Sequence, residues 1–157
     1  MKRHSIVLKS KIFLTILLFV TTLISCDHAE VDGVVIDHTL YENLTLSKQT
    51  ELKKLVRLTL NKDENALTKL NNFWCGGAAG CYDLGFVVTQ IIYRLGEDEF
   101  IKMVVKLDRE RISGLEGLIA AGLEYGDNNK DGKMDNKQIE TEFPKLHKVL
   151  SDKYSKE

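Results

Sequence analysis

The sequence predicts an all-α fold, a compact bundle or short αα-superhelix of about six helices. Three observations favour this class. Leu, Lys and Glu are abundant and there is one proline, Pro144, which suits helices joined by polar turns. Apolar residues recur at helical spacing through most of the chain after residue 45. Asparagine, aspartate and glycine stand between the periodic segments, where these residues cap helices and form turns.

Two helices are expected first. Thr45 or Ser47 caps the first helix, whose apolar face is Leu52, Leu55, Val56 and Leu60. Asn61 and Lys62 interrupt this periodicity, and Asp63 is a suitable N-cap for the second helix. The second apolar face comprises Ala66, Leu67, Leu70, Phe73 and Trp74.

The most apolar stretch of the domain is YDLGFVVTQIIYRL, residues 82–95. Its β-branched residues would also suit a strand, but its length and the glycine after it, Gly96, favour a buried helix. Asp98 is then expected to cap a short helix. The apolar face of that helix comprises Phe100, Ile101, Val104 and Val105.

Asp108 is expected to cap a longer helix that ends at Tyr125. Its apolar stripe comprises Ile112, Leu115, Leu118, Ile119 and Leu123. Gly114, Gly117 and Gly122 lower helix propensity, so we expect them to permit close approach of a neighbouring helix. A closing amphipathic segment carries Ile139, Phe143, Leu146, Val149 and Leu150. Pro144 is expected to divide it into a short turn and a final helix.

Cys75 and Cys81 enclose five small residues in the segment WCGGAAGC. Small residues let the chain turn tightly enough to meet the geometry of a bridge. A redox pair usually has the spacing C-x-x-C, and no second Cys/His pair is available for zinc. We therefore expect a structural disulfide, provided that the protein is exported.

Residues 127–138, DNNKDGKMDNKQ, combine residue types and spacing that indicate a particular chemistry. Oxygen-bearing side chains occupy loop positions 1, 3, 5 and 9, namely Asp127, Asn129, Asp131 and Asp135. Gly132 permits a sharp turn. Met134 is expected to point into the core. A solvated turn between helices has a similar composition. The regular spacing of the oxygen-bearing residues is what favours a cation-binding loop over such a turn.

This pattern resembles the EF-hand calcium loop and the related loops of dockerin-like modules. The resemblance implies a calcium site with the ligands Asp127, Asn129, Asp131, Lys133 (through its backbone carbonyl), Asp135 and Gln138. Gln138 stands where the EF-hand has a bidentate glutamate, and three lysines offset the three aspartates. The resemblance therefore implies weak binding, with Kd on the order of 10⁻⁴–10⁻³ M. Because one loop is present and sensors usually pair two, we expect a structural clip.

The N-terminal segment predicts export. Four basic residues precede an apolar run from Ile12 to Ile24, which is too short to span a membrane and has the length of a signal-peptide core. The run ends in Leu23-Ile24-Ser25-Cys26, which resembles the lipobox of bacterial lipoproteins. The resemblance implies thioether lipidation of Cys26, cleavage before it, and acylation of the new N-terminus, for example with palmitate. The alternatives are an ordinary signal peptide with a chance cysteine and an uncleaved anchor.

The expected organisation is a signal peptide at 1–25, a lipidated cysteine and tether at 26–44, and a helical domain at 45–157. Within the tether, residues 34–36 form a small strand or lie on the domain. The domain would face the periplasm or the cell exterior from its membrane anchor.

Charge and motifs limit the function classes. Four of the 22 basic residues and none of the 23 acidic residues precede Cys26, so 18 basic and 23 acidic residues remain, a net charge of −5. This charge argues against nucleic acid as a partner. Metalloprotease, serine-hydrolase and phosphate-loop motifs are absent from the sequence, so an uncharacterised hydrolase is the weaker hypothesis.

The favoured hypothesis is a lipid-anchored binding or interaction module with a weak structural calcium site. The alternatives are an immunity-type lipoprotein that neutralises a toxin and a passive structural component of the envelope. Trp74, Tyr82 and Tyr125 are expected in the core, although the same aromatic residues would suit a partner surface.

Overall fold

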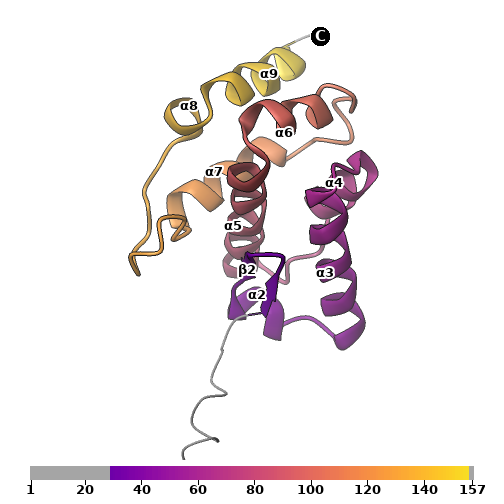
Figure 1. Cartoon of the computed structure of the whole chain (residues 1–157), viewed down its shortest axis with the longest axis vertical. Coiled ribbons are helices and arrows are strands. Elements are labelled where there is room, and N and C mark those ends of the chain that lie inside the picture. Colours follow the sequence, from indigo (N-terminus) through magenta and orange to yellow (C-terminus); the bar gives the residue numbers. More distant parts are fainter. Residues whose placement is uncertain (1–28, 156–157) are drawn as a thin grey trace, which may run out of the picture.

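Helix α5 (Ala78–Leu95) is the central element, and most other segments pack around it. The computed structural model describes residues 29–155, whose helices gather around α5 (Figure 1). These residues form eight helices, six of them with seven residues or more, and one two-stranded hairpin, so the predicted all-α class is confirmed. The predicted signal peptide at 1–25 and the lipidation site Cys26 lie outside the described residues.

The chain from Ala29 to Leu44 belongs to the packed body. Strands β1 (Ala29–Val31) and β2 (Val34–Ile36) form an antiparallel hairpin, and helix α2 (His38–Glu42) follows. The buried side chains of this region are Val31, Val34, Ile36, Leu40 and Leu44. The predicted strand at 34–36 is confirmed. The predicted tether is wrong for residues 29–44, because β2 and α2 pack against α5.

Helices α3 (Leu46–Leu60) and α4 (Glu64–Asn71) begin at polar caps that the sequence predicts. The Thr45 hydroxyl accepts a hydrogen bond from the backbone N–H of Lys48 at 3.4 Å, so Thr45 is the cap of α3. The Asp63 carboxylate accepts from the N–H of Ala66 at 2.9 Å. Both caps satisfy donors that the first turn of a helix leaves unpaired.

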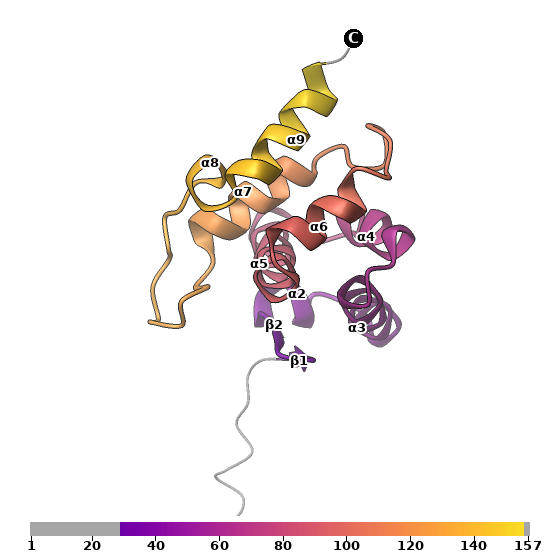
Figure 2. The ribbon, with the colours of Figure 1, turned by 45° about the horizontal axis from the view of Figure 1, so that its top comes forward.

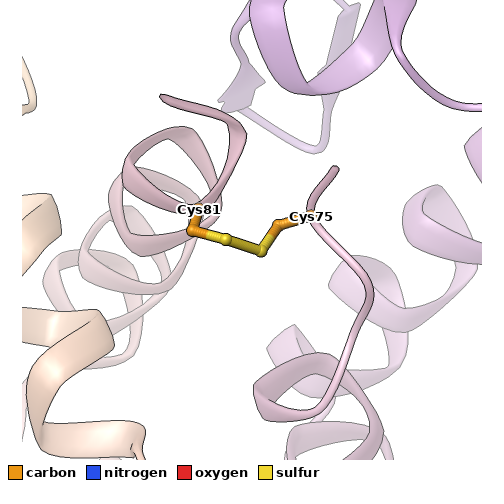
Figure 3. The surroundings of a disulfide bond; sticks show 2 residues. All are labelled: Cys75 and Cys81. Carbon is orange, nitrogen blue, oxygen red and sulfur yellow. A yellow bond between two sulfur atoms is a disulfide. The ribbon is translucent and has the colours of Figure 1, made fainter. Parts of the chain in front are cut away.

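Helix α5 begins before the predicted Tyr82 and ends at Gly96, as predicted. Gly96 has a φ of 82°, a backbone conformation that favours glycine. The predicted disulfide between Cys75 and Cys81 is confirmed, with the two Cα atoms 4.9 Å apart. It joins the segment after α4 to the first turn of α5 (Figure 3).

Helices α6 (Glu97–Val104) and α7 (Leu115–Tyr125) begin differently from the prediction. Asp98 lies inside the first turn of α6, where its charge suits the helix dipole, and Gly96 occupies the N-cap. Asp108 caps only a turn, by accepting a hydrogen bond from the N–H of Arg111 at 2.9 Å. Gly114, with a φ of 86°, separates this turn from α7. The predicted caps at Asp98 and Asp108 are therefore wrong.

Helices α5 and α7 approach each other through two glycines. A Cβ atom added to Gly122 would lie 2.1 Å from the carbonyl oxygen of Gly85, and one added to Gly85 would lie 2.3 Å from the carbonyl oxygen of Leu118. The predicted close approach is therefore confirmed for Gly122. It is wrong for Gly114 and Gly117, where an added Cβ would meet no atom within 4 Å.

The last two helices, α8 (Ile139–Glu142) and α9 (Pro144–Ser155), are divided at Pro144 as predicted. Helix α9 packs against α6 (Figure 2), and the carboxylate of Glu97 accepts a hydrogen bond from the N–H of Leu146 at 2.9 Å. The buried residues of this region are Ile139, Phe143, Leu146 and Leu150. Between residues 29 and 155, no helix is both long enough and apolar enough to cross a membrane.

Candidate functional site

The predicted calcium loop connects α7 to α8 and folds back on the end of α7. The backbone N–H of Asp135 donates to the carbonyl of Gly126 at 3.0 Å, and that of Asn136 donates to Glu124 at 3.1 Å. The N–H of Lys137 donates to the carbonyl of Leu123 at 3.0 Å. The returning half of the loop thus satisfies carbonyl groups that the end of a helix would otherwise leave unpaired. It also fixes the loop close to α7.

The first half of the loop is held by side-chain oxygens that turn inward. The two carboxylate oxygens of Asp127 accept hydrogen bonds from the N–H of Asp131 at 2.9 Å and of Gly132 at 2.8 Å. The side-chain oxygen of Asn129 accepts from the same N–H of Asp131, also at 2.9 Å. Gly132 has a φ of 82°, so it provides the predicted turn. Asp127 and Asn129 therefore both turn a side-chain oxygen toward the N–H of Asp131.

Asp135 is the feature of the loop that fits a cation best. Its side chain is fully buried, and its Oδ2 atom accepts a hydrogen bond from the N–H of Asn128 at 3.0 Å. The ammonium of Lys137 lies 3.8 Å from the same oxygen. The Oδ1 atom is buried and has no hydrogen-bond partner among the described residues. A buried carboxylate oxygen without a partner is destabilising, so a cation or a water molecule at Oδ1 would stabilise it.

Other positions of the loop depart from the EF-hand pattern. Gln138 has an extended backbone just before α8, and its exposed side chain is not carried on the outgoing helix. Lys133 and Met134 are also exposed, and the expected inward orientation of Met134 is wrong, because 60% of its surface is accessible. In the described part of the chain, no group of three or more His, Cys, Asp or Glu side chains is arranged to hold a metal. The calcium site stays a prediction.

Asn128, which the spacing does not single out, connects the loop to two helices. Its side-chain oxygen lies 2.9 Å from the hydroxyl of Thr89 on α5, and its amide nitrogen donates to the carbonyl of Gly122 on α7 at 3.0 Å. Asn128 lies at an even position of the loop, between the predicted ligands. Only the juxtaposition of α5 and α7 gives it this role, and no local sequence signal indicates that juxtaposition.

Two adjoining cavities lie beside the loop, and together we call them the Tyr82–Tyr125 groove. Their volumes are about 320 and 250 Å³, and both are lined by Asp37 and Phe86. Tyr82 of α5 and Tyr125 of α7 line the larger cavity, with their rings stacked at 4.4 Å between centroids. The larger cavity is also lined by Asp83 and Met134, and the smaller one by Gln90, Asp127 and Lys130.

The aromatic residues expected in the core are exposed instead. Accessible fractions are 62% for Trp74, 41% for Tyr82 and 39% for Tyr125. Trp74 and Tyr82 directly flank the two cysteines of the disulfide, so the bridge holds their backbones near each other. The prediction of core burial is wrong for these three residues, because neighbouring positions such as Phe73 and Leu84 occupy the core.

The larger cavity of the groove is lined by two carboxylates, Asp37 and Asp83. Burial raises the pKa of Asp83, and the nearby Asp37 carboxylate raises it further, while the N–H of Leu40 opposes this shift by donating to Asp83 at 2.8 Å. A hydrogen bond to the Glu124 carboxylate raises the pKa of the Tyr125 hydroxyl. Of these carboxylates, Asp37 and Asp83 line the larger cavity, where they would stabilise a positive charge.

Comparison of the chain with family models, curated proteins and solved structures finds no match.

Proposed function

We propose that the protein is a lipid-anchored binding module of the bacterial envelope, with a loop at residues 127–138 that holds calcium as a structural clip. The observation that carries the binding role is the Tyr82–Tyr125 groove, whose stacked tyrosine rings are partly exposed beside carboxylates. Aromatic side chains that remain accessible on a folded body are typical of surfaces that bind other proteins. Met134, at 60% exposure, extends the same apolar surface.

The start of the packed body supports a position close to the membrane. Ala29 already belongs to strand β1, and it follows Cys26 by three residues in the sequence. An extended chain covers at most about 3.6 Å per residue, so a lipid on Cys26 would hold Ala29 within roughly 10 Å of the anchor. A partner would then be bound at the membrane surface.

The buried Oδ1 atom of Asp135 supports the calcium clip. Calcium takes six to eight oxygen ligands, including carboxylates, amides and carbonyls. Asp127 and Asn129 both turn side-chain oxygens into the loop, where these accept a hydrogen bond from the N–H of Asp131. A cation held by them and by Asp135 would join the two halves of the loop, and so hold α7 to α8.

A calcium-dependent change in thermal stability tests the clip. We expect millimolar calcium to raise the Tm of residues 27–157 by about 3–6 °C, because a ligand that binds only the folded state at about ten times its Kd stabilises by roughly 1.4 kcal/mol. Asp127→Ala should remove this shift, whereas Asp152→Ala, on the exposed face of α9, should retain it. Differential scanning calorimetry with calcium and with a chelator measures both. An equal shift in the two variants, or none in the wild type, contradicts the clip.

Site-specific photo-crosslinking in the bacterium tests the binding role. A photoreactive phenylalanine analogue placed at Tyr125 should yield a discrete crosslinked product, because this ring lines the groove. The same analogue at Val105, which is exposed at the end of α6, serves as the matched control. Immunoblotting of membrane fractions shows the products. Identical products from both positions, or no product from Tyr125, would refute a partner at the groove.

A further inference from the structure

The larger cavity of the Tyr82–Tyr125 groove is lined by both apolar and acidic side chains. The apolar lining residues of the larger cavity include Tyr82, Tyr125, Phe86 and Met134. The acidic lining residues of the same cavity are Asp83 and, from the segment between β2 and α2, Asp37. Both carboxylates are partly buried, which limits their hydration. Aromatic faces and poorly hydrated carboxylates each attract cations.

The charges around the groove favour a cationic ligand. Asp37 lies close enough to Asp83 for the two carboxylates to repel each other, and both line the larger cavity. Lys130 lines the adjoining cavity, and His38 lies near Asp83. Lys130 does not line the larger cavity, whose charged lining residues are Asp37 and Asp83. A ligand with positive charge would reduce the repulsion between Asp37 and Asp83.

We propose that the Tyr82–Tyr125 groove binds an arginine side chain presented by a partner protein. The larger cavity, about 320 Å³, lies at the lower end of the range of small-molecule sites, about 300–1,000 Å³, and suits one long side chain. A guanidinium group is planar, stacks on aromatic rings and donates paired hydrogen bonds to carboxylates. A guanidinium can therefore interact with both the aromatic rings and the carboxylates of the lining, whereas an ammonium group interacts mainly with the carboxylates. This proposal rests on the binding role proposed above.

A tripeptide pair tests the proposal on the full chain in detergent micelles. The probe is acetyl-Gly-Arg-Gly-amide, and its control has citrulline, which has nearly the same shape without the charge. Saturation-transfer NMR at increasing peptide concentration gives the two dissociation constants. We expect the arginine peptide to bind about tenfold more tightly, because one cation–π contact and one carboxylate contact together supply roughly 1.4 kcal/mol. Equal binding of the two peptides overturns the proposal.

Two groove variants and one matched control locate the binding site. Asp83→Asn retains a side-chain oxygen for the N–H of Leu40 and removes the charge, and Tyr125→Leu removes a ring that is already partly exposed. Each should weaken binding of the arginine peptide at least about fivefold. Glu51→Gln removes one charge from a separate cavity between α3 and α4, so it should leave binding unchanged. An equal loss in Glu51→Gln, or unchanged binding in both groove variants, overturns the proposal.

The arginine proposal and the binding role fail in different ways. If crosslinking from position 125 yields a discrete product while the arginine peptide binds no better than its citrulline control, the groove has a partner of other chemistry and the arginine proposal is overturned. If the arginine peptide binds at the groove and position 125 yields a discrete product, the proposal is supported. If the peptide binds but no crosslinked product is found, the groove recognises arginine and its presentation by a partner protein is overturned.

Discussion

Gly122→Ala is expected to destabilise the protein by about 3 kcal/mol, or to prevent folding, because its methyl group would lie 2.1 Å from the carbonyl oxygen of Gly85. The neighbouring atoms belong to the backbone of α5, which cannot rotate away as a flexible side chain can. Relief therefore requires that α5 and α7 separate, although their contact is the most extensive between any two elements of the described chain. Urea unfolding followed by circular dichroism measures the loss of unfolding free energy.

Gly117→Ala is the matched control for this prediction. It lies on the same helix, and its added methyl group would meet no atom within 4 Å. Alanine favours the helix over glycine by about 0.8–1.0 kcal/mol, so Gly117→Ala should stabilise the protein slightly. If both substitutions changed stability by the same amount, helix propensity alone would explain the result, and the close approach of α5 and α7 would be incorrect.

The sequence predicts those features of the fold that depend on neighbouring residues. The caps at Thr45 and Asp63, the stop at Gly96 and the division at Pro144 each follow from local backbone chemistry. Sequence alone does not show which glycines permit close approach of a second helix, because glycines in similar sequence contexts differ in this role. Gly122 meets Gly85 only because α7 crosses α5 at that point.

The N-terminal hairpin shows a local signal whose consequence depends on tertiary packing. Asp32-Gly33 lies between Val31 and Val34, and both of its residues have positive φ, 50° and 82°, as a two-residue hairpin turn requires. An Asp-Gly pair between apolar residues is a strong hairpin signal, which the tether interpretation overlooks. The burial of this hairpin is not a local property, since α5 provides the surface that covers it.

The candidate site also combines features set by neighbouring residues with features set by tertiary packing. Alternating oxygen-bearing residues and Gly132 predict the tight first half of the loop, because its hydrogen bonds join residues close in sequence. The exposure of Met134 and Tyr125 was not predictable from spacing. An apolar side chain is buried only where another segment covers it, and helical periodicity does not show where coverage ends.

Gln90→Met is expected to destabilise the protein by about 2–4 kcal/mol, because it leaves the backbone of Val35 without two partners. The side-chain oxygen of Gln90 accepts a hydrogen bond from the N–H of Val35 at 2.8 Å, and its nitrogen donates to the carbonyl of Val35 at 2.9 Å. Gln90 is 9% exposed, so water replaces these bonds poorly. Methionine has a similar size and flexibility, and the substitution therefore tests hydrogen bonding more than packing.

Gln49→Met provides the comparison. The Gln49 side chain donates to the carbonyls of Tyr41 and Leu44, at 2.9 and 3.3 Å, and it accepts no backbone N–H. We expect its loss to cost about 0.5–1.5 kcal/mol. Amide hydrogen exchange separates the two variants, since only Gln90→Met should accelerate exchange at Val35. Unchanged exchange at Val35 would contradict the bridging role of Gln90.

The same bridge connects the stability of the fold to the proposed ligand site. Val35 and Gln90 both line the smaller cavity, and Asp37 follows β2 directly. Loss of the bridge would free β2 from α5 and displace Asp37, so Gln90→Met should also weaken arginine-peptide binding, by about fivefold. Gln49→Met leaves the bridge between β2 and α5 intact, so it should retain arginine-peptide binding. Retained binding in Gln90→Met, together with accelerated exchange at Val35, would show that the groove does not depend on β2.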